Sequence, residues 1–202
     1  HFPSQKKYFA DFVVEENEKV ASLFAAYGMR LVFTGHFHAQ DIVLRRFASH
    51  SFLFDVETAS LITYPCAFRT VRFGADGKAR VRSRTVTSLP SLTYFPHYAL
   101  ALLWTGVSDM LEHRLHRYRL SPSDIRLLVP QIVGGLVANI AGDETPPDVL
   151  LDSTGLSLTA RVAIGLAGDL LYGAWHDPPP PDNNLIIDLS TGAWAVPEEA
   201  AP

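Results

Sequence analysis

Two histidines separated by one residue follow a short apolar run, in the stretch Leu31-Val-Phe-Thr-Gly-His-Phe-His38. Imidazole nitrogens are common ligands of divalent metals. In a turn, two side chains with this spacing can point toward neighbouring positions, and a pair of adjacent metals is a usual device for hydrolysing phosphate esters. Gly35 permits a sharp turn and a close approach of the backbone to a ligand. His36 and His38 are therefore the candidate metal ligands.

Four other polar residues are weaker candidates. Gln40 and Asp41 follow the pair, and either could accept a hydrogen bond from the second ring nitrogen of a metal-bound histidine. Each could equally be a loop residue that caps the next turn. His113 and His116 are three residues apart on a predicted helix, a spacing that can hold a metal. Arginines beside them disfavour a second cation, so a solvated helix face is the favoured interpretation.

The histidine pair needs a strand and a helix to position it. Residues 14–27 carry apolar side chains at helical spacing, and Gly28 is a natural helix end. The apolar and β-branched run 31–34 predicts a buried strand. A helix, a tight turn and a buried strand make half of an α/β unit. In such folds the functional crevice lies at the carboxyl ends of the strands, which is where the pair lies.

Downstream of the pair, the pattern predicts short strands at 51–54, 60–64, 68–73 and 79–86, the last two joined by an Asp-Gly hairpin turn. Helices are predicted over 98–118, from Ser121 onward, and over 156–175. Ser121 and Pro122 are typical of a helix start. Pro130 predicts a kink or a split in the second of these helices. A proline-rich connector at 177–182 precedes a possible returning strand at 185–189.

Composition narrows the class of protein. Hydrophobic residues make up 48% and charged residues 19%, a globular balance. The net charge is -4 and no cationic block occurs, so no nucleic-acid surface is evident. The single cysteine, Cys66, excludes an internal disulfide. The longest apolar stretch, 125–142, contains Arg126, Pro130 and Asn139, so no membrane span is expected. No signal peptide is visible, and the sequence assigns no compartment.

The stretch 31–41 resembles the last metal-binding motif of the calcineurin-like metallophosphoesterases, an apolar strand followed by Gly-His-x-His. The segment Glu57-Thr-Ala-Ser60, followed by Pro65 and by Arg69, is also similar to the sequence downstream of that motif. The resemblance covers about residues 1–90. It implies an α/β fold in which 1–92 is the C-terminal half of an αββα sandwich, with a mixed or antiparallel sheet and a flanking helix. An α-helical subdomain at 93–202 would follow.

The resemblance also implies a chemistry. Members of the family bind two divalent metal ions, Mn, Fe or Zn, and a metal-activated hydroxide attacks the phosphorus of a phosphate ester. His36 would bind the second metal and His38 the first. Metals in this role lower the pKa of water and neutralise charge on the phosphoryl oxygens.

The earlier motifs of the family do not occur in this chain. Neither Asp-x-His nor Asn-His is present. Gly142-Asp143 and Gly168-Asp169 come after the histidine pair, and we expect them at a helix end and in a helix interior. His1 is near the position of the family's separate histidine but is not assigned to it. We therefore expect the C-terminal part of a longer phosphoesterase, with metal bound weakly or not at all by this chain alone.

Three further expectations follow. The chain would hold one sheet of the sandwich, and its uncovered apolar face would self-associate or bind the N-terminal part of the same protein. A non-catalytic interaction or scaffold domain, with a relic metal motif, is the alternative. A single-metal hydrolase, built from the two histidines and a distant carboxylate such as Asp55, is the third hypothesis.

Overall fold

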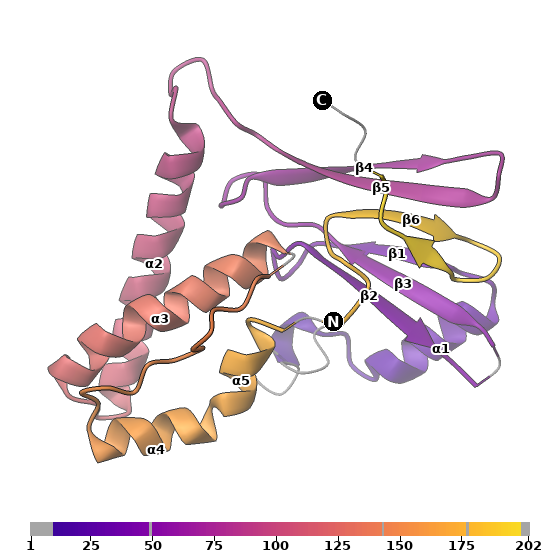
Figure 1. Ribbon diagram of the computed structural model, residues 1–202. Coiled ribbons are helices and arrows are strands. Elements are labelled where there is room, and N and C mark those ends of the chain that lie inside the picture. Colours follow the sequence, from indigo (N-terminus) through magenta and orange to yellow (C-terminus); the bar gives the residue numbers. More distant parts are fainter. Residues whose placement is uncertain (1–9, 49, 143, 177, 199–202) are drawn as a thin grey trace.

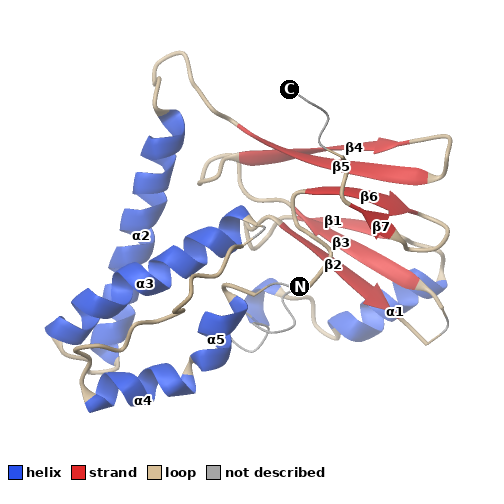
Figure 2. Ribbon diagram, in the orientation of Figure 1, coloured by secondary structure: helices blue, strands red, loops and turns tan. Residues whose placement is uncertain are grey.

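Alternating apolar residues build two β-sheets that stack on each other (Figures 1 and 2). The computed structural model describes residues 10–48, 50–142, 144–176 and 178–198. The first sheet has the order β1 (Leu31–Thr34), β3 (Phe52–Glu57), β2 (Asp41–Arg46), with β1 parallel and β2 antiparallel to β3. The second is antiparallel, in the order β4 (Ala67–Phe73), β5 (Lys78–Thr85), β6 (Asn184–Asp188), β7 (Trp194–Ala195).

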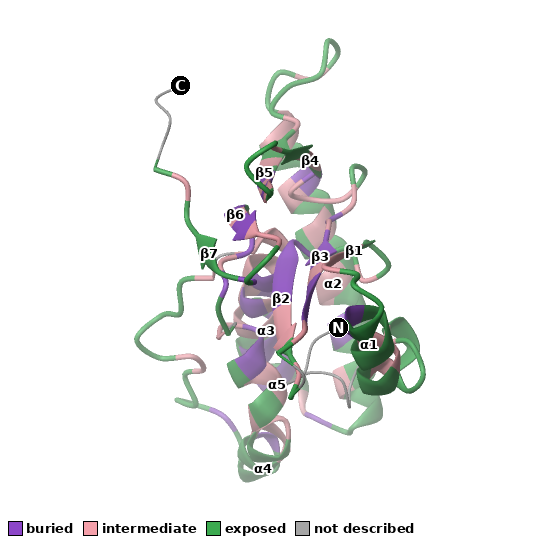
Figure 3. Cartoon of the chain, turned by 90° about the vertical axis from the view of Figure 1, so that its right-hand side faces the viewer, coloured by how far each residue is buried: buried purple, intermediate pink, exposed green. Residues whose placement is uncertain are grey.

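The inward faces of the two sheets form one hydrophobic core (Figure 3). Buried side chains from both sheets meet there: Ile42, Phe52, Phe54, Val56, Ala79, Val81, Leu185 and Ile187. The α/β fold class is confirmed, as are a mixed sheet and a flanking helix. The expectation that the chain holds only one sheet is wrong, because β4 and β5 gain β6 and β7 from the C-terminal region and cover the first sheet.

Helix α1 (Asn17–Ala26) lies on the other face of the first sheet, where it contacts β3 (Figure 1). The helix predicted over 14–27 is therefore confirmed, with a later start. Glu16 precedes it in the left-handed region, at φ 51°. A short 3-10 turn, η1 (Ala10–Phe12), comes before α1 in the chain.

The remaining helices gather beside the sheets (Figure 1). They are α2 (Phe95–Arg117), α3 (Pro122–Ala141), α4 (Leu158–Leu166) and α5 (Gly168–Gly173). A second core joins α2, α3 and α4, formed by Leu111, Leu120, Ile125, Leu128, Val129, Val133, Leu156 and Ala160. The cap prediction is confirmed, since the Asp124 amide donates to Ser121 Oγ at 3.1 Å.

Two helix predictions need correction. Of the kink or split expected in the second helix, the split does not occur. Helix α3 continues through Pro130, with Leu128, Val129 and Val133 buried. The helix predicted over 156–175 is two helices that meet at Ala167. The amide of Ala167 donates hydrogen bonds to the carbonyls of Ala163 and Ile164. Glycines at 165 and 168 flank this junction, and glycine disfavours a continuous helix.

One predicted strand is absent from the structure, and one observed strand was not predicted. The strand expected at 60–64 is a segment of bends and a turn, and Leu61 and Ile62 are exposed instead of packed. Strand β2 was not predicted, although Ile42 and Val43 are a β-branched pair of the kind that fills strands. The Asp-Gly hairpin between β4 and β5 is confirmed, with Gly77 at φ 71°.

The C-terminal strand returns to the front of the chain, as expected. Strand β6 pairs with β5 in antiparallel register, Val81 opposite Leu185, and both side chains are fully buried. The helical region is thus enclosed between strands of one sheet, and residues far apart in the sequence share a single core.

Among the described residues, α3 is the helix long and apolar enough to cross a membrane. The core helix of a globular protein can have the same length and apolar composition. This helix carries buried Asp124 and Asn139 and packs against α2. This packing makes α3 a core helix of the helical region, consistent with the expected absence of a membrane span.

Asp124 links the starts of α3 and α4 and yields a pH prediction. Its carboxylate accepts hydrogen bonds from Ser121 Oγ at 2.6 Å and from the Ser157 amide and Oγ, both at 2.8 Å. The Ser121 hydroxyl, followed by Ser157, lowers the pKa of Asp124 to about 2. These hydrogen bonds stabilise the fold at their full strength when the pH is above about 3.9, the pKa of an aspartate in the unfolded chain. The stabilisation is lost as the pH falls toward about 2, where the folded-state carboxylate is protonated.

We therefore expect wild type to exceed Asp124→Asn in stability at pH 6, with a gap that closes between about pH 4 and pH 2. Urea unfolding of both proteins across this range measures the gap. Asp76 and Asp188 also have pKa values lowered to about 2, by hydrogen bonds from Arg80 and Ser190, and they are common to both proteins. A gap that stays constant with pH would contradict the assignment.

Candidate functional site

The histidine turn connects β1 to β2 at the carboxyl end of β1. His36 and His38 are both exposed, whereas Ala39 and Gln40 directly after them are buried. His38 has φ 64°, in the left-handed region where histidine is among the enriched side chains. The prediction that the pair follows a strand is confirmed by this placement, although β1 is half-buried to exposed and not buried as expected.

The segment after β3 holds this turn in place. The Thr58 amide donates to the Thr34 carbonyl at 3.0 Å, which continues the β1–β3 ladder to its end. The Phe37 amide, between the two histidines, donates to Glu57 Oε1 at 2.8 Å. A Cβ on Gly35 would lie 3.3 Å from the Thr58 carbonyl oxygen, so the glycine permits a close approach of two backbones.

Gln40 joins the turn to four other segments. Its Oε1 accepts from the Ala59 amide at 2.9 Å and from Arg69 Nε at 3.2 Å, and its Nε2 donates to Asn183 Oδ1 at 3.2 Å. Its backbone amide donates to the Ile140 carbonyl at the end of α3. Gln40 lies in the loop before β2, which was one of its two predicted placements, and its side chain enters this buried network. Its role as an acceptor for a ligating histidine stays a prediction.

Asp41 is the first residue of β2, not a loop residue. It lies opposite Glu57 in the antiparallel register and is buried, with 2% of its surface exposed. The β2 edge beside it contacts the C-terminal region, since the Ile42 amide donates to Asp182 Oδ1 at 3.1 Å. Its predicted role beside a metal-bound histidine stays a prediction.

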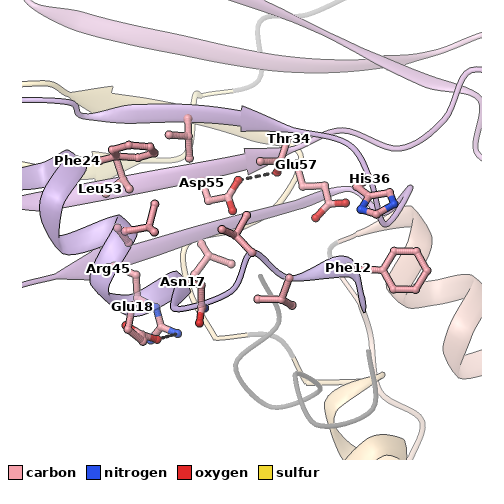
Figure 4. Close-up of a pocket in the computed structure, with 16 residues that line it drawn as sticks. Phe12, Asn17, Glu18, Phe24, Thr34, His36, Arg45, Leu53, Asp55 and Glu57 are labelled. Atoms are coloured by element: carbon pink, nitrogen blue, oxygen red, sulfur yellow. Dashed lines mark hydrogen bonds and ion pairs between the residues drawn. The ribbon is translucent and has the colours of Figure 1, made fainter. Parts of the chain in front are cut away.

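A cavity of about 280 Å³ lies between α1 and the first sheet and reaches His36 (Figure 4). Its walls are mainly apolar, with Val20 and Phe24 from α1 and Leu53 from β3. Asp55 and Glu57 point into it from β3 (Figure 4). The polar end of the cavity is therefore the end nearest the histidine turn.

Phe12 closes the cavity beside the turn. Its ring lies 5.0 Å from the His36 ring and 5.2 Å from the Phe37 ring, measured between centroids. Asp55 Oδ1 accepts from Thr34 Oγ1 at 2.6 Å, and Arg45 pairs with Glu18 at 3.1 Å (Figure 4). The Asp55–Thr34 bond lies nearer to His36 than the Arg45–Glu18 pair, which is at the far end of the cavity (Figure 4), and His36 is exposed.

The described residues do not form a complete metal centre. No group of three or more His, Cys, Asp or Glu side chains in the described ranges could hold a metal ion. His36 and His38 can donate imidazole nitrogens, but Asp55 does not join them in such a group. His113 and His116 are exposed on α2, as expected for a solvated helix face. This part of the chain supplies two donors suited to a metal centre and not the whole ligand set.

Two predicted positions lie at the limits of the described residues. His1 and Asp143 are outside them, so neither can be placed relative to the turn. Gly142 ends α3, as expected for the Gly142-Asp143 pair. Gly168 is the first residue of α5, where a helix interior had been predicted.

Sequence reasoning missed two residues that contact the turn. Phe12 carries no sequence signal that connects it to His36. Glu57 lies in the Glu-Thr-x-Ser segment that contributes to the family resemblance, so this segment was a usable signal. No family model matches the chain, and no curated protein matches it.

Proposed function

We propose that this chain is the C-terminal part of a two-metal phosphoesterase that hydrolyses phosphate esters, with His36 and His38 as its metal ligands. The metals, Mn, Fe or Zn, would activate water and neutralise charge on the phosphoryl group when bound. The remaining ligands would come from the N-terminal part of the same protein, and the chain by itself would be inactive.

One observation carries this proposal. A Gly-His-x-His turn stands at the carboxyl end of a strand in an α/β sheet, with both imidazoles exposed and the turn held from β3. In open α/β sheets this edge is where ligands bind. Exposed imidazoles on a restrained turn suit metal binding, because a metal site gains affinity from ligands that are already oriented.

Expression of the intact gene, with all sequence encoded upstream, tests the proposal. We expect that product to hydrolyse p-nitrophenyl phosphate or its bis ester in the presence of manganese, and to lose the activity when a chelator removes the metal. The 202-residue chain alone is expected to show no turnover. Manganese-dependent hydrolysis by the chain alone would contradict the division of the ligand set.

A scaffold function is the second candidate, and exposed apolar residues on the helices favour it. Leu158, Val162 and Leu166 recur every four residues on α4, and each is more than half exposed. Residues at this spacing share one helix face. A scaffold predicts an intact gene product without phosphoesterase activity, which the same assay measures.

Self-association is a further prediction. In the described part of the chain, β1 and β4 are outer strands of their sheets. Phe33 lies opposite buried Val56 in register and faces inward, yet 55% of its surface is exposed. Apolar side chains at an open strand edge favour association.

We expect the chain alone to elute with light-scattering masses above its 22.3 kDa monomer. Phe33→Lys is expected to shift the distribution toward the monomer, because a lysine on an edge strand opposes pairing. A wild-type chain that stays monomeric at all concentrations, with no companion present, would contradict this prediction.

A further inference from the structure

Glu57 is a buried carboxylate in direct contact with the histidine turn. It is the last residue of β3, and only 2% of its surface is exposed. It lies opposite Thr34, the last residue of β1, in the parallel register. A buried carboxylate is costly unless hydrogen bonds satisfy it, so its position requires a structural or functional reason.

The contact of Glu57 falls between the two candidate ligands. Its Oε1 accepts the amide proton of Phe37 at 2.8 Å. That amide belongs to the peptide unit that joins His36 to Phe37. The hydrogen bond therefore restrains the orientation of this peptide plane, and with it the backbone that carries the His36 side chain. A backbone amide bonded to a carboxylate makes a shorter and stronger hydrogen bond than one bonded to a neutral acceptor.

Two further hydrogen bonds, one to a backbone carbonyl and one to a side chain, flank this bond. The Thr58 amide binds the Thr34 carbonyl before the turn, and the Ala59 amide binds Gln40 Oε1 after it. Three consecutive residues of the β3 end, 57–59, therefore hold residues 34, 37 and 40. Of these three contacts, the Glu57 bond is the one that reaches the interior of the turn.

We propose that Glu57 is a positioning residue, which fixes the His36–Phe37–His38 backbone so that both imidazoles project in one orientation. The value of this role for metal binding rests on the proposed function, but the restraint itself is a property of the chain. Beside this bond, Phe37 packs against Phe12, and His38 is exposed.

Three variants of the 202-residue chain test the proposal. Glu57→Ala removes the acceptor, Glu57→Asp withdraws it by one methylene, and Glu57→Gln keeps an oxygen of the same reach. The readouts are the hydrogen-exchange rate of the Phe37 amide and the ring carbon–proton NMR signals of His36 and His38.

We expect the Phe37 amide to exchange at least about 10-fold faster in Glu57→Ala and Glu57→Asp, which corresponds to about 1.4 kcal/mol. The histidine signals are expected to shift or broaden in the same variants. In Glu57→Gln the exchange rate should remain much closer to that of wild type. Unchanged Phe37 exchange in folded Glu57→Ala or Glu57→Asp would overturn the proposal.

The metal measurement separates this proposal from the proposed function. In the intact gene product we expect Glu57→Ala to weaken Mn²⁺ binding by about 10- to 100-fold, the range for residues that orient ligands, with partial rescue by Glu57→Gln. If His36→Ala and His38→Ala leave Mn²⁺ affinity unchanged, the proposed function fails. If those variants lose affinity but Glu57→Ala does not, the positioning role fails alone.

Discussion

Replacing His36 or His38 by alanine in the intact gene product is expected to lower kcat/KM for a phosphate ester by at least about 100-fold, or about 2.7 kcal/mol of transition-state stabilisation. Each imidazole would be the single ligand that this turn gives to one of two metals. Its loss would leave that metal with an incomplete and poorly oriented ligand set.

The fold should not suffer from either change, because both side chains are exposed. Thermal unfolding of each variant is expected to match wild type within about 0.5 kcal/mol. His113→Ala is the matched control, since it removes an exposed histidine from α2. Steady-state assays with manganese should show wild-type activity in this control. Full activity in His36→Ala and His38→Ala would remove the basis of the phosphoesterase proposal.

Replacing Leu185 by alanine is expected to reduce the free energy of unfolding by about 2–5 kcal/mol. The side chain is fully buried between the two sheets, where it packs with Phe54 and Val81. Truncation leaves a cavity that close-packed neighbours fill only in part. For a chain of this size, each kcal/mol lowers Tm by about 2–4 °C, so a large shift is expected in calorimetry or circular dichroism.

Leu166→Ala provides the comparison, with the same atoms removed from a side chain that is 80% exposed at the end of α4. Its effect is expected to stay within about 0.5 kcal/mol. Similar losses in the two variants would show that β6 does not pack into the core that the structure describes.

The sequence by itself determined the local elements around the candidate site. The apolar run before Gly35 fixed a strand, the Asp-Gly pair fixed the β4–β5 hairpin, and Ser121 fixed the start of α3. Each of these signals operates within a few residues, through side-chain burial, turn geometry or a cap, so neighbouring residues are enough to predict it.

The predictions that were wrong depended on contacts outside the local window. Leu61 and Ile62 have the composition of a strand, but among the residues that the structure describes no strand pairs with them. Pro130 predicted a kink or a split, and the split is absent, since residues buried on both sides of Pro130 favour a continuous α3. Local preference is a weak influence when packing favours another conformation.

Only the tertiary structure decided what surrounds the histidine pair. Sequence spacing identified His36 and His38, because two imidazoles in a turn are a local pattern. The contacts of Phe12 and Glu57 with that turn arise where η1 and β3 converge on the end of β1, and Gln40 binds Asn183 across most of the chain. Such contacts depend on sheet register and helix packing. These bring together residues that are far apart in the sequence and whose spacing there gives no sign of the contact.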